Sequence, residues 1–516
     1  MNTYDEIRVK EGCCLRLKRF LFVKLKDKEF LKGISTLIGA ALINFIAGAI
    51  FGVCQLVLYE ISYIKWTISE STITIDNEIF YYPTVKLCQH ISSFLSGIIY
   101  KTIGLHFTNL IGFILLFSGY LTLFLSKSFV VDIVSMSLSG IGTGIIYYPS
   151  TANACEWYVK HNGIVIGIVE TSISLGSFFF NLLGEQLIKK DKNKSDNKEN
   201  DFYTKEEGEK FKEFMIYLII IIIVLYVLSF LLTFKKVKDK FKDTKSAKVG
   251  LLQLEETEEE INESQDEENE KFDEKQLELI ANNVEFDKKK KYSLKQMFFA
   301  AIKSKLFIIF ALIVIFEGPI SSMIFSLFMS IGKKFGVQRL FLSSIGPINF
   351  LFECLGGFVI GLLCDYLPIK FLLLFILGVE SIIGYFYCLT FDSNVLFFIF
   401  TNICSFTSGG FYSVKDYHLI RVYGVDLYVV LIGLINFFSS IVVLSLTPLS
   451  FSFEKSDKTS KVPYWIMFII FGTFSAIGFA LSFFIKDDSF DYDKVLSDDN
   501  EKENGNKLIK NEEIGI

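Results

Sequence analysis

The stretch GIGTGIIYYPSTANACEWYVKHNGIVIGIVETSISLGS, residues 140–177, contains the end of one long apolar segment, a short polar turn and the start of a second apolar segment. The hydrocarbon core of a bilayer is about 30 Å thick and a helix rises about 1.5 Å per residue, so roughly 20 apolar residues cross it. The segments on the two sides of the turn, 129–152 and 162–184, both reach that length. We therefore predict two membrane-spanning helices joined by a short loop.

The rest of the chain contains more segments of the same kind. Measured by the same length, the first half of the chain has predicted spans at 33–58, 79–100, 105–125, 129–152, 162–184 and 213–234. The second half has predicted spans at 305–330, 341–364, 369–390, 395–413, 427–449 and 464–485. The prediction is an all-α membrane protein with twelve transmembrane helices in two sets of six.

The composition of the 516-residue chain agrees with a membrane protein. Hydrophobic residues make up 51% of it, aromatic residues 16%, and the mean hydropathy is +0.43. The net charge of −5 is not that of a nucleic-acid-binding protein. The nine cysteines lack the paired spacing of a disulfide framework or a zinc site. These values exclude an intrinsically disordered chain, a collagen-like repeat and a secreted disulfide scaffold, and no cleaved signal peptide is expected.

Charge and polarity divide the chain outside the spans. We expect a basic tail at 1–32, six-helix bundles at 33–234 and 298–486, an acidic connector at 235–297 and a polar tail at 487–516. The connector has too few apolar side chains to offset the entropy of ordering, which predicts disorder. The alternative is a docking platform for a partner. Basic residues near the span ends place both tails and the connector on the cytoplasmic side.

Two pairs of segments indicate an internal repeat. GIIYKTIG at 97–104 and GLLCDYLP at 361–368 each lie between the second and third spans of their set. GIIYYPSTANACEWYVKHNG, from 144, and GFYSVKDYHLIRVYGVDLYV, from 410, each cover the end of a fourth span and an aromatic turn. Equivalent positions in equivalent loops predict a duplicated six-helix unit with parallel topology.

The stretch 140–177 resembles the fourth-span to fifth-span signature of major facilitator superfamily transporters, and is most similar to the monocarboxylate transporter and oxalate/formate antiporter branches. The resemblance implies two bundles that rock about a central solute site. The run at 361–370 resembles the superfamily's loop motif, with proline where glycine is usual. The positions that carry the resemblance, or that we expect to pack or gate the bundles, are Gly140, Gly142, Gly144, Tyr148, Pro149, Trp157, Gly163, Gly361, Asp365, Pro368 and Lys370.

The chain departs from this family pattern at several positions. In the first loop motif Lys101 replaces the family's acid and Thr102 its arginine. The resemblance implies that this acid contacts helix ends across a half-bundle, so the usual gating contact is not expected at Lys101. The eighth span has Gly357 where these branches have an arginine for a carboxylate, and the eleventh span lacks the basic residue of oxalate-type members.

Acids inside spans are the first candidates for chemistry, because an acid or base at the bilayer centre costs roughly 2.5 to 3.5 kcal/mol on insertion scales. Glu317 precedes Gly318 and Pro319, which bend the seventh span. The resemblance places this helix on the central cavity, so Glu317 either couples protons, contacts solute or bonds a neighbouring helix. Glu353 and Glu170 are either protonatable or cation-binding sites, or neutral acids bonded inside a bundle. A functional role for Glu380 is less favoured, because the resemblance puts its helix at the periphery.

Lys86, Gln89 and His90 form the only basic cluster at depth. Their spacing of three and four residues puts them on one helix face. Lys86 either supplies positive charge for a carboxylate, pairs with a glutamate, or extends to the membrane interface. His90 is either a titrating group or a satisfied hydrogen-bond donor.

The expected function is secondary active transport of a small organic solute across a lipid bilayer. Monocarboxylates or similar organic anions are the first choice by resemblance, with protons as a coupling ion. The alternatives are an amino acid or organic cation carrier and a transport-inactive receptor or scaffold. We expect no enzyme activity, no cofactor and no metal site, because the sequence has no phosphate-binding loop, metal-binding histidine pair or nucleophile elbow.

Overall fold

The computed structural model describes residues 28–68, 80–188, 203–236, 292–337, 339–455, 461–486 and 490–492. Over these residues the regular elements are helices and no strand occurs. Most of the predicted basic tail, the acidic connector and the polar tail lies outside the described residues. The predicted disorder of the connector therefore stays a prediction.

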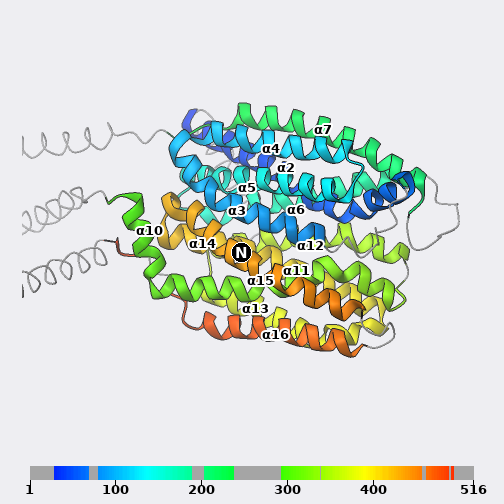
Figure 1. Ribbon diagram of the computed structural model, residues 1–516. Coiled ribbons are helices and arrows are strands. Elements are labelled where there is room, and N and C mark those ends of the chain that lie inside the picture. Colours follow the sequence, from blue (N-terminus) through cyan, green and yellow to red (C-terminus); the bar gives the residue numbers. More distant parts are fainter. Residues whose placement is uncertain are drawn as a thin grey trace, which may run out of the picture. The chain divides into compact units, whose positions relative to one another are not determined.

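Six long helices precede the connector, and we call them the N-terminal bundle (Figure 1). Helix α2 packs against α5, α6 and α7, while α5 packs against α3 and α4. Their bounds are α2 Lys28–Ile68, α3 Tyr81–Ile103, α4 Leu105–Leu125, α5 Phe129–Trp157, α6 Asn162–Ile188 and α7 Lys205–Leu232.

Six further long helices follow the connector and form the C-terminal bundle, drawn from green to red in Figure 1. Helix α12 packs against α14, α13 against α16, and α11 against α15 and α16. The bounds are α11 Lys305–Lys334, α12 Arg339–Cys364, α13 Ile369–Phe386, α14 Asn394–Tyr423, α15 Val425–Lys455 and α16 Val462–Ser482. The short helices α10 Leu294–Lys303 and η3 Tyr387–Asp392 complete the described elements.

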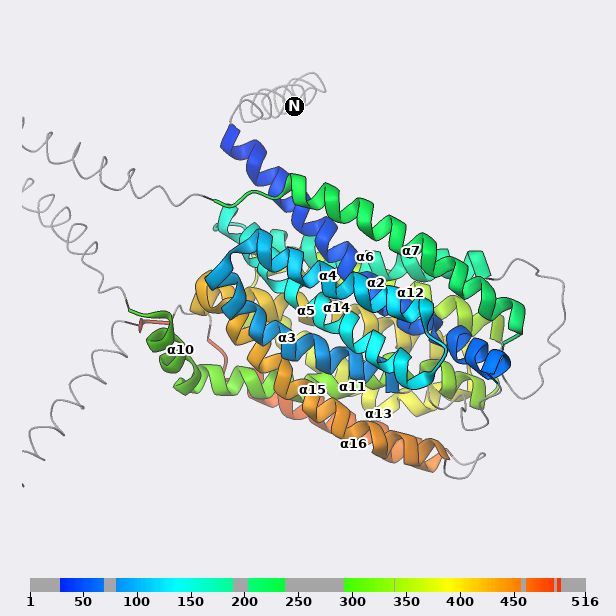
Figure 2. The same cartoon turned by 45° about the horizontal axis from the view of Figure 1, so that its top comes forward.

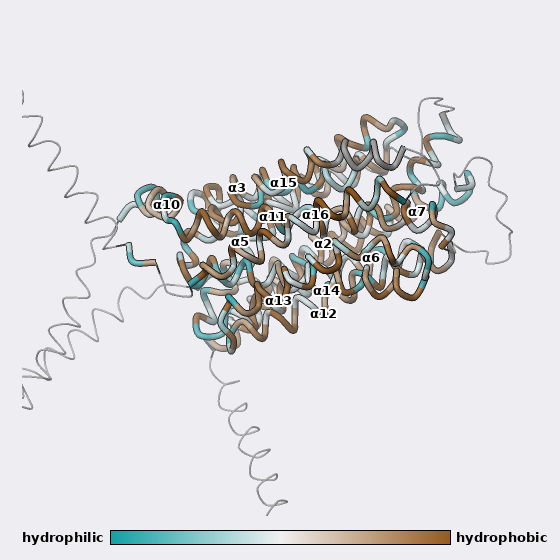
Figure 3. Tube along the Cα trace, turned by 90° about the horizontal axis from the view of Figure 1, so that it is seen from below, coloured by the Kyte–Doolittle hydropathy of each residue, from teal (hydrophilic) through white to brown (hydrophobic). Residues whose placement is uncertain are grey.

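Each predicted span has a counterpart among these twelve long helices. Eleven of the helices are long and apolar enough to cross a membrane. The twelfth is α3, which has 23 residues but is less apolar because it carries Lys86, Gln89 and His90. Apolar residues follow the helices along their length, as the hydropathy colouring in Figure 3 shows. The chain is an integral, multi-pass membrane protein.

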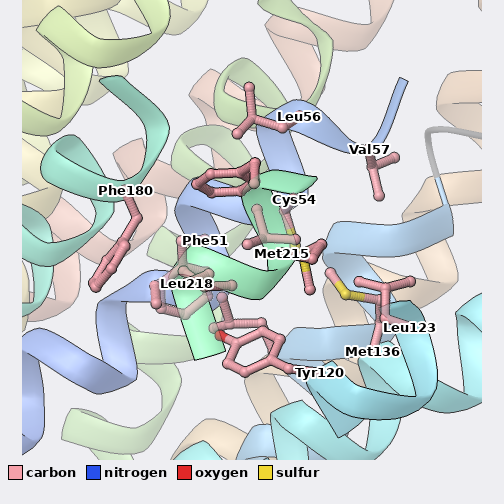
Figure 4. Close-up of a cluster of buried hydrophobic side chains, with 14 of the residues drawn as sticks. Phe51, Cys54, Leu56, Val57, Tyr120, Leu123, Met136, Phe180, Met215 and Leu218 are labelled. Carbon is pink, nitrogen blue, oxygen red and sulfur yellow. The ribbon is translucent and has the colours of Figure 1, made fainter. Parts of the chain in front are cut away.

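The core of the N-terminal bundle is built around α2. Apolar side chains of α2 meet those of α4, α5, α6 and α7 in one cluster, from which Phe51, Tyr120, Met136, Phe180 and Met215 are drawn in Figure 4. A second cluster in the C-terminal bundle includes residues of α11, α13, α14 and α16. In lipid there is little hydrophobic drive between helices, so close packing of this kind holds a bundle together.

Several helices are longer than the predicted spans. Helix α14 continues to Tyr423, whereas its span was predicted to end at residue 413. A polar run follows residue 413. It stays helical because its charged side chains find partners inside the protein, and the helix ends at Gly424, whose φ of 82° suits a residue without a Cβ.

Candidate functional site

A central cavity lies between the two bundles. Its volume is about 790 Å³, including the part open to solvent, and side chains of α2, α3, α5, α6, α11, α12 and α14 line it. A smaller cavity of about 460 Å³ shares some of its lining residues and adds residues of α15. The larger cavity thus brings aromatic and charged side chains of both bundles together.

Two lysines from opposite bundles reach this cavity. Lys86 is on α3 and Lys415 on α14. The Lys86 ammonium lies 4.3 Å from the centre of the Phe51 ring, and the two ammonium groups lie 5.4 Å and 4.7 Å from the centre of the Tyr412 ring. Lys415 also donates a hydrogen bond to Asn436 Oδ1 at 3.2 Å. The aromatic faces stabilise both cations.

Neither lysine has an ion-pair partner in the part of the chain that the structure describes. The ion pairs found there, with nitrogen and oxygen within 4.0 Å, involve other basic residues. A buried charge without a counter-ion is costly unless a ligand supplies one. Two such cations in one cavity can accept an anion.

Three predicted acids also line these cavities. Glu170 and Glu353 line the larger cavity, and Glu317 lines the smaller one. Glu317 accepts a hydrogen bond from Ser321 at 2.9 Å, and Glu170 accepts one from Tyr147. Glu380 is fully buried and lines neither cavity. The site therefore holds protonatable groups next to the two cations.

The predicted polar face of α3 is found at the cavity. Lys86, Gln89 and His90 all line it. The His90 ring forms a hydrogen bond with Ser440 of α15, in the other bundle. Helices α3 and α15 lie side by side in Figure 2. The histidine is thus part of the contact between the bundles as well as of the cavity wall.

A buried polar network that the sequence analysis did not find joins the bundles beside the cavity. Asn436 of α15 donates to the hydroxyl of Tyr148 of α5 at 2.6 Å. Tyr428 of α15 donates to Asp416 of α14 at 2.7 Å. Lys415 and Asp416 were missed because they follow the predicted end of their span. The signal that could have found them is the absence of glycine or proline between Gly410 and Gly424, which allows the helix to continue.

Glycines let the two bundles approach closely between α6 and α12. A Cβ on Gly163 would lie 2.6 Å from the carbonyl oxygen of Gly361, and a Cβ on Gly361 would lie 2.6 Å from Gly167 Cα. Real Cβ atoms do not come so close to backbone atoms. Gly163 and Gly361 therefore need glycine so that α6 and α12 can pack backbone against backbone, while a Cβ on Gly167 would be tight at 3.3 Å from Gly361 Cα.

The other predicted glycines pack helices inside the N-terminal bundle. A Cβ on Gly140 or Gly144 would lie 2.8 Å or 2.1 Å from carbonyl oxygens of α3, and a Cβ on Gly142 would lie 2.4 Å from a backbone nitrogen of α4. Pro149 lies inside α5, and Trp157 at the end of α5 donates to the carbonyl of Phe234 at 3.3 Å. The fourth-span part of the signature thus fixes α5 against its neighbours.

The second loop motif makes a direct contact across the bundles. Asp365, at the end of α12, accepts hydrogen bonds from the backbone nitrogens of Gly163 at 2.9 Å and Ile164 at 3.0 Å. These nitrogens are free donors at the beginning of α6, where the helix dipole favours a negative charge. Next to it, Pro368 caps α13, and Lys370 donates to the carbonyl of Phe483 at 2.8 Å.

The first loop motif also makes a contact across the bundles, which corrects the expectation for Lys101. Lys101 forms an ion pair with Asp426 in the first turn of α15. Its position in the repeat corresponds to that of Asp365. An acid can bind the beginning of a helix directly, whereas a lysine is repelled by the positive helix end and needs an acid placed there. Asp426 is that acid. The contact between the loop motif and the beginning of a helix is therefore kept, with the positive side chain on the loop motif and the negative one on the helix.

We expect reversal of this ion pair to weaken the contact and the double reversal to restore it. The side chains are 28% and 51% exposed, so the pair stabilises the closed contact by no more than about 1 kcal/mol. Lys101→Asp should slow transport a few-fold through repulsion of Asp426, and Lys101→Asp with Asp426→Lys should recover most of the rate. Lys127→Asp, at an exposed lysine, is the matched control. Equal uptake rates for the single and double variants would contradict the interpretation.

The comparisons with known proteins agree with this architecture. The family model described as Major Facilitator Superfamily matches residues 34–447. Among solved structures, the fucose:proton symporter FucP of E. coli is similar with a TM-score of 0.57 and 12% sequence identity, over 87% of this chain and 98% of that one. At this identity the likeness concerns the fold. No curated protein matches the chain. The chain belongs to the Major Facilitator Superfamily of transporters.

Proposed function

We propose that the chain is a proton-coupled carrier for a small organic solute with a carboxylate group, with monocarboxylates as the first choice. The observation that carries this proposal is the pair Lys86 and Lys415, which line one cavity without an ion-pair partner among the described residues. A carboxylate between them would be the counter-ion of both ammonium groups and would accept charge-assisted hydrogen bonds from them.

The origin of the two lysines supports alternating access. Lys86 belongs to the N-terminal bundle and Lys415 to the C-terminal bundle. A solute bound by both would favour arrangements in which the two bundles close on it, because a ligand shifts an equilibrium by its difference in affinity for the two states. Aromatic side chains of Phe51, Tyr82 and Tyr412 would surround the apolar part of the solute.

The acids of the site support protons as the coupling ion. Glu170, Glu317 and Glu353 line the same cavities as the lysines. The charged form of a carboxyl group is costly inside a membrane protein, so such a group can bind a proton there. The fucose:proton symporter of similar fold is, by its name, a proton-coupled carrier.

The test is uptake of a labelled monocarboxylate, such as lactate, into proteoliposomes that contain the purified protein. We expect accumulation when an inward proton gradient is imposed and little when it is collapsed with a protonophore. Liposomes without protein, and a neutral sugar as solute, are the controls. Uptake that neither exceeds that of empty liposomes nor responds to the gradient would overturn the proposal.

An amino acid or organic cation is the second candidate, favoured by Glu353. Its carboxyl group lines the cavity together with Lys86 and can bind an amino group. If the solute carries a positive charge, Glu353→Gln should abolish its uptake, whereas uptake of a plain monocarboxylate should continue. Competition between labelled lactate and unlabelled amino acids in the wild type and in Glu353→Gln distinguishes the two candidates. A variant that transports a cationic solute at the wild-type rate would exclude the second one.

A further inference from the structure

Two buried acids from opposite bundles face each other next to the cavity. Glu170 is on α6 and Asp416 on α14, and they are 5% and 0% exposed. Their carboxyl groups lie within hydrogen-bonding reach of each other. Glu170 lines the larger cavity, whereas Asp416 is not among its lining residues. The pair thus has one member in contact with the cavity and one member behind it.

The hydrogen bonds around the pair leave one carboxylate oxygen without a donor. Asp416 Oδ2 accepts a hydrogen bond from Tyr428 at 2.7 Å, and Glu170 Oε1 accepts one from Tyr147. Asp416 Oδ1 is buried and receives no donor from any group of the described residues. Ionised carboxylates only accept hydrogen bonds. Two of them side by side would repel, so the contact requires a proton on one of them.

The charged and titratable groups around the pair do not replace the proton that the two carboxyl groups require. The lysine next in line, Lys415, donates to Asn436 and forms no ion pair with either acid within 4.0 Å. A tyrosine hydroxyl or a cysteine thiol brings no full positive charge. The groups that face the pair or share its cavity are Tyr147, Tyr148 and Cys155 of α5, Tyr82, Lys86 and His90 of α3, Glu353 of α12, Cys404, Tyr412 and Lys415 of α14, and Tyr428 of α15.

We infer that Glu170 and Asp416 together bind one proton, and that this proton fastens the two bundles to each other beside the solute cavity. The inference rests on the proposed function, for which it names the coupling site. When the proton leaves Glu170 for water in the cavity, two negative carboxylates face each other across α6 and α14. Their repulsion loosens the contact that Tyr147 and Tyr428 otherwise complete.

This arrangement ties proton binding to the position of the bundles. A proton that binds only when α6 and α14 are together favours the joined arrangement, and the joined arrangement in turn binds the proton more tightly. The second lysine of the solute site, Lys415, directly precedes Asp416 on α14. A solute carboxylate at Lys415 and a proton at Asp416 would therefore act on the same segment of the same helix.

The first measurement is the infrared carbonyl band of protonated carboxylic acids in the purified full-length protein, and it does not depend on transport. Glu170→Gln and Asp416→Asn should each remove the same component of that band. In either variant the new amide donates the hydrogen bond that the proton made, and the remaining acid becomes ionised. Glu185→Gln, on the same helix but only partly buried, is the matched control and should leave the component in place. Thermal unfolding of each variant verifies that it is folded.

The second measurement is lactate uptake into proteoliposomes with and without an inward proton gradient. The ratio of the two rates should fall close to one in both amide variants and stay at the wild-type value in Glu185→Gln. A band component that disappears in Glu170→Gln but persists in Asp416→Asn would overturn the shared proton, because the proton would then belong to Glu170 alone. A band that behaves as expected without any lactate uptake by the wild type would leave the pair standing and overturn the proposed function. If Glu170→Gln does not fold, Asp416→Asn still tests the proposal, because a component that persists in that variant would overturn the shared proton.

Discussion

Replacement of Lys86 by glutamine is expected to lower monocarboxylate uptake roughly 10- to 100-fold, because a hydrogen bond to a charged group contributes about 1.5 to 3 kcal/mol and each 1.4 kcal/mol is a factor of ten. The ammonium of Lys86 lies in the cavity, held against the face of Phe51 and without an ion-pair partner in the described part of the chain. Glutamine keeps much of the length of the side chain but brings no charge for the solute.

The same change at Lys415 is expected to have an effect of similar size. Lys415→Gln removes the second cation from the opposite bundle, and the hydrogen bond to Asn436 can be replaced by the amide. Uptake is measured over a range of solute concentrations, so that loss of binding is separated from loss of turnover. Lys127→Gln at an exposed position is the matched control, and Lys86→Arg tests whether charge alone suffices. Wild-type uptake in either glutamine variant would show that the lysines do not bind the solute.

The second large effect is expected at the glycines between α6 and α12. Gly361→Ala would place a Cβ 2.6 Å from Gly167 Cα, so the two backbones must separate. Overpacking costs about 1 to 3 kcal/mol, which shifts the closed arrangement of this interface by roughly 5- to 100-fold. We expect transport to fall accordingly, while both bundles stay folded because the glycine packs between them.

A matched control lies one turn earlier on the same helix. A Cβ on Gly357 would lie 3.5 Å from the nearest atom, an ordinary contact, and a Cβ on Gly167 would lie 3.3 Å from Gly361 Cα. Alanine should therefore be tolerated at Gly357, reduce uptake mildly at Gly167 and reduce it strongly at Gly361. Reaction of a cysteine placed at Ile164 with a water-soluble maleimide reports whether the interface has opened. Equal uptake in all three variants would contradict close packing as the reason for these glycines.

The sequence predicted the fold because the thickness of a membrane fixes the length of the apolar segments that cross it. Every helix that crosses needs a run of apolar residues of bilayer length, and such a run is visible without any knowledge of its neighbours. The second span was correctly predicted as a helix although Lys86, Gln89 and His90 make it the least apolar of the twelve. The predicted monocarboxylate or oxalate/formate branch is a finer statement, and it stays part of the proposed function.

The site was predictable only in part. Lys86, Glu170, Glu317 and Glu353 could be selected because a charged residue inside a span is costly and needs a reason. Lys415 and Asp416 were missed, because their charged side chains led to a predicted end of the span before them. The ion pair of Lys101 was not predicted, because its partner Asp426 lies 325 residues further along the chain.

The sequence by itself determined that this protein crosses the membrane repeatedly and that Lys86, Glu170, Glu317 and Glu353 belong to spans, since both follow from local hydrophobicity and helix length. The tertiary structure alone decided which of those charges meet. It brought Lys86 and Lys415 to one cavity, set Glu170 against Asp416 and turned Lys101 toward Asp426. Contacts between bundles depend on helix rotation and on backbone approach at glycines, and these are properties of pairs of helices far apart in the chain, which no single stretch of sequence records.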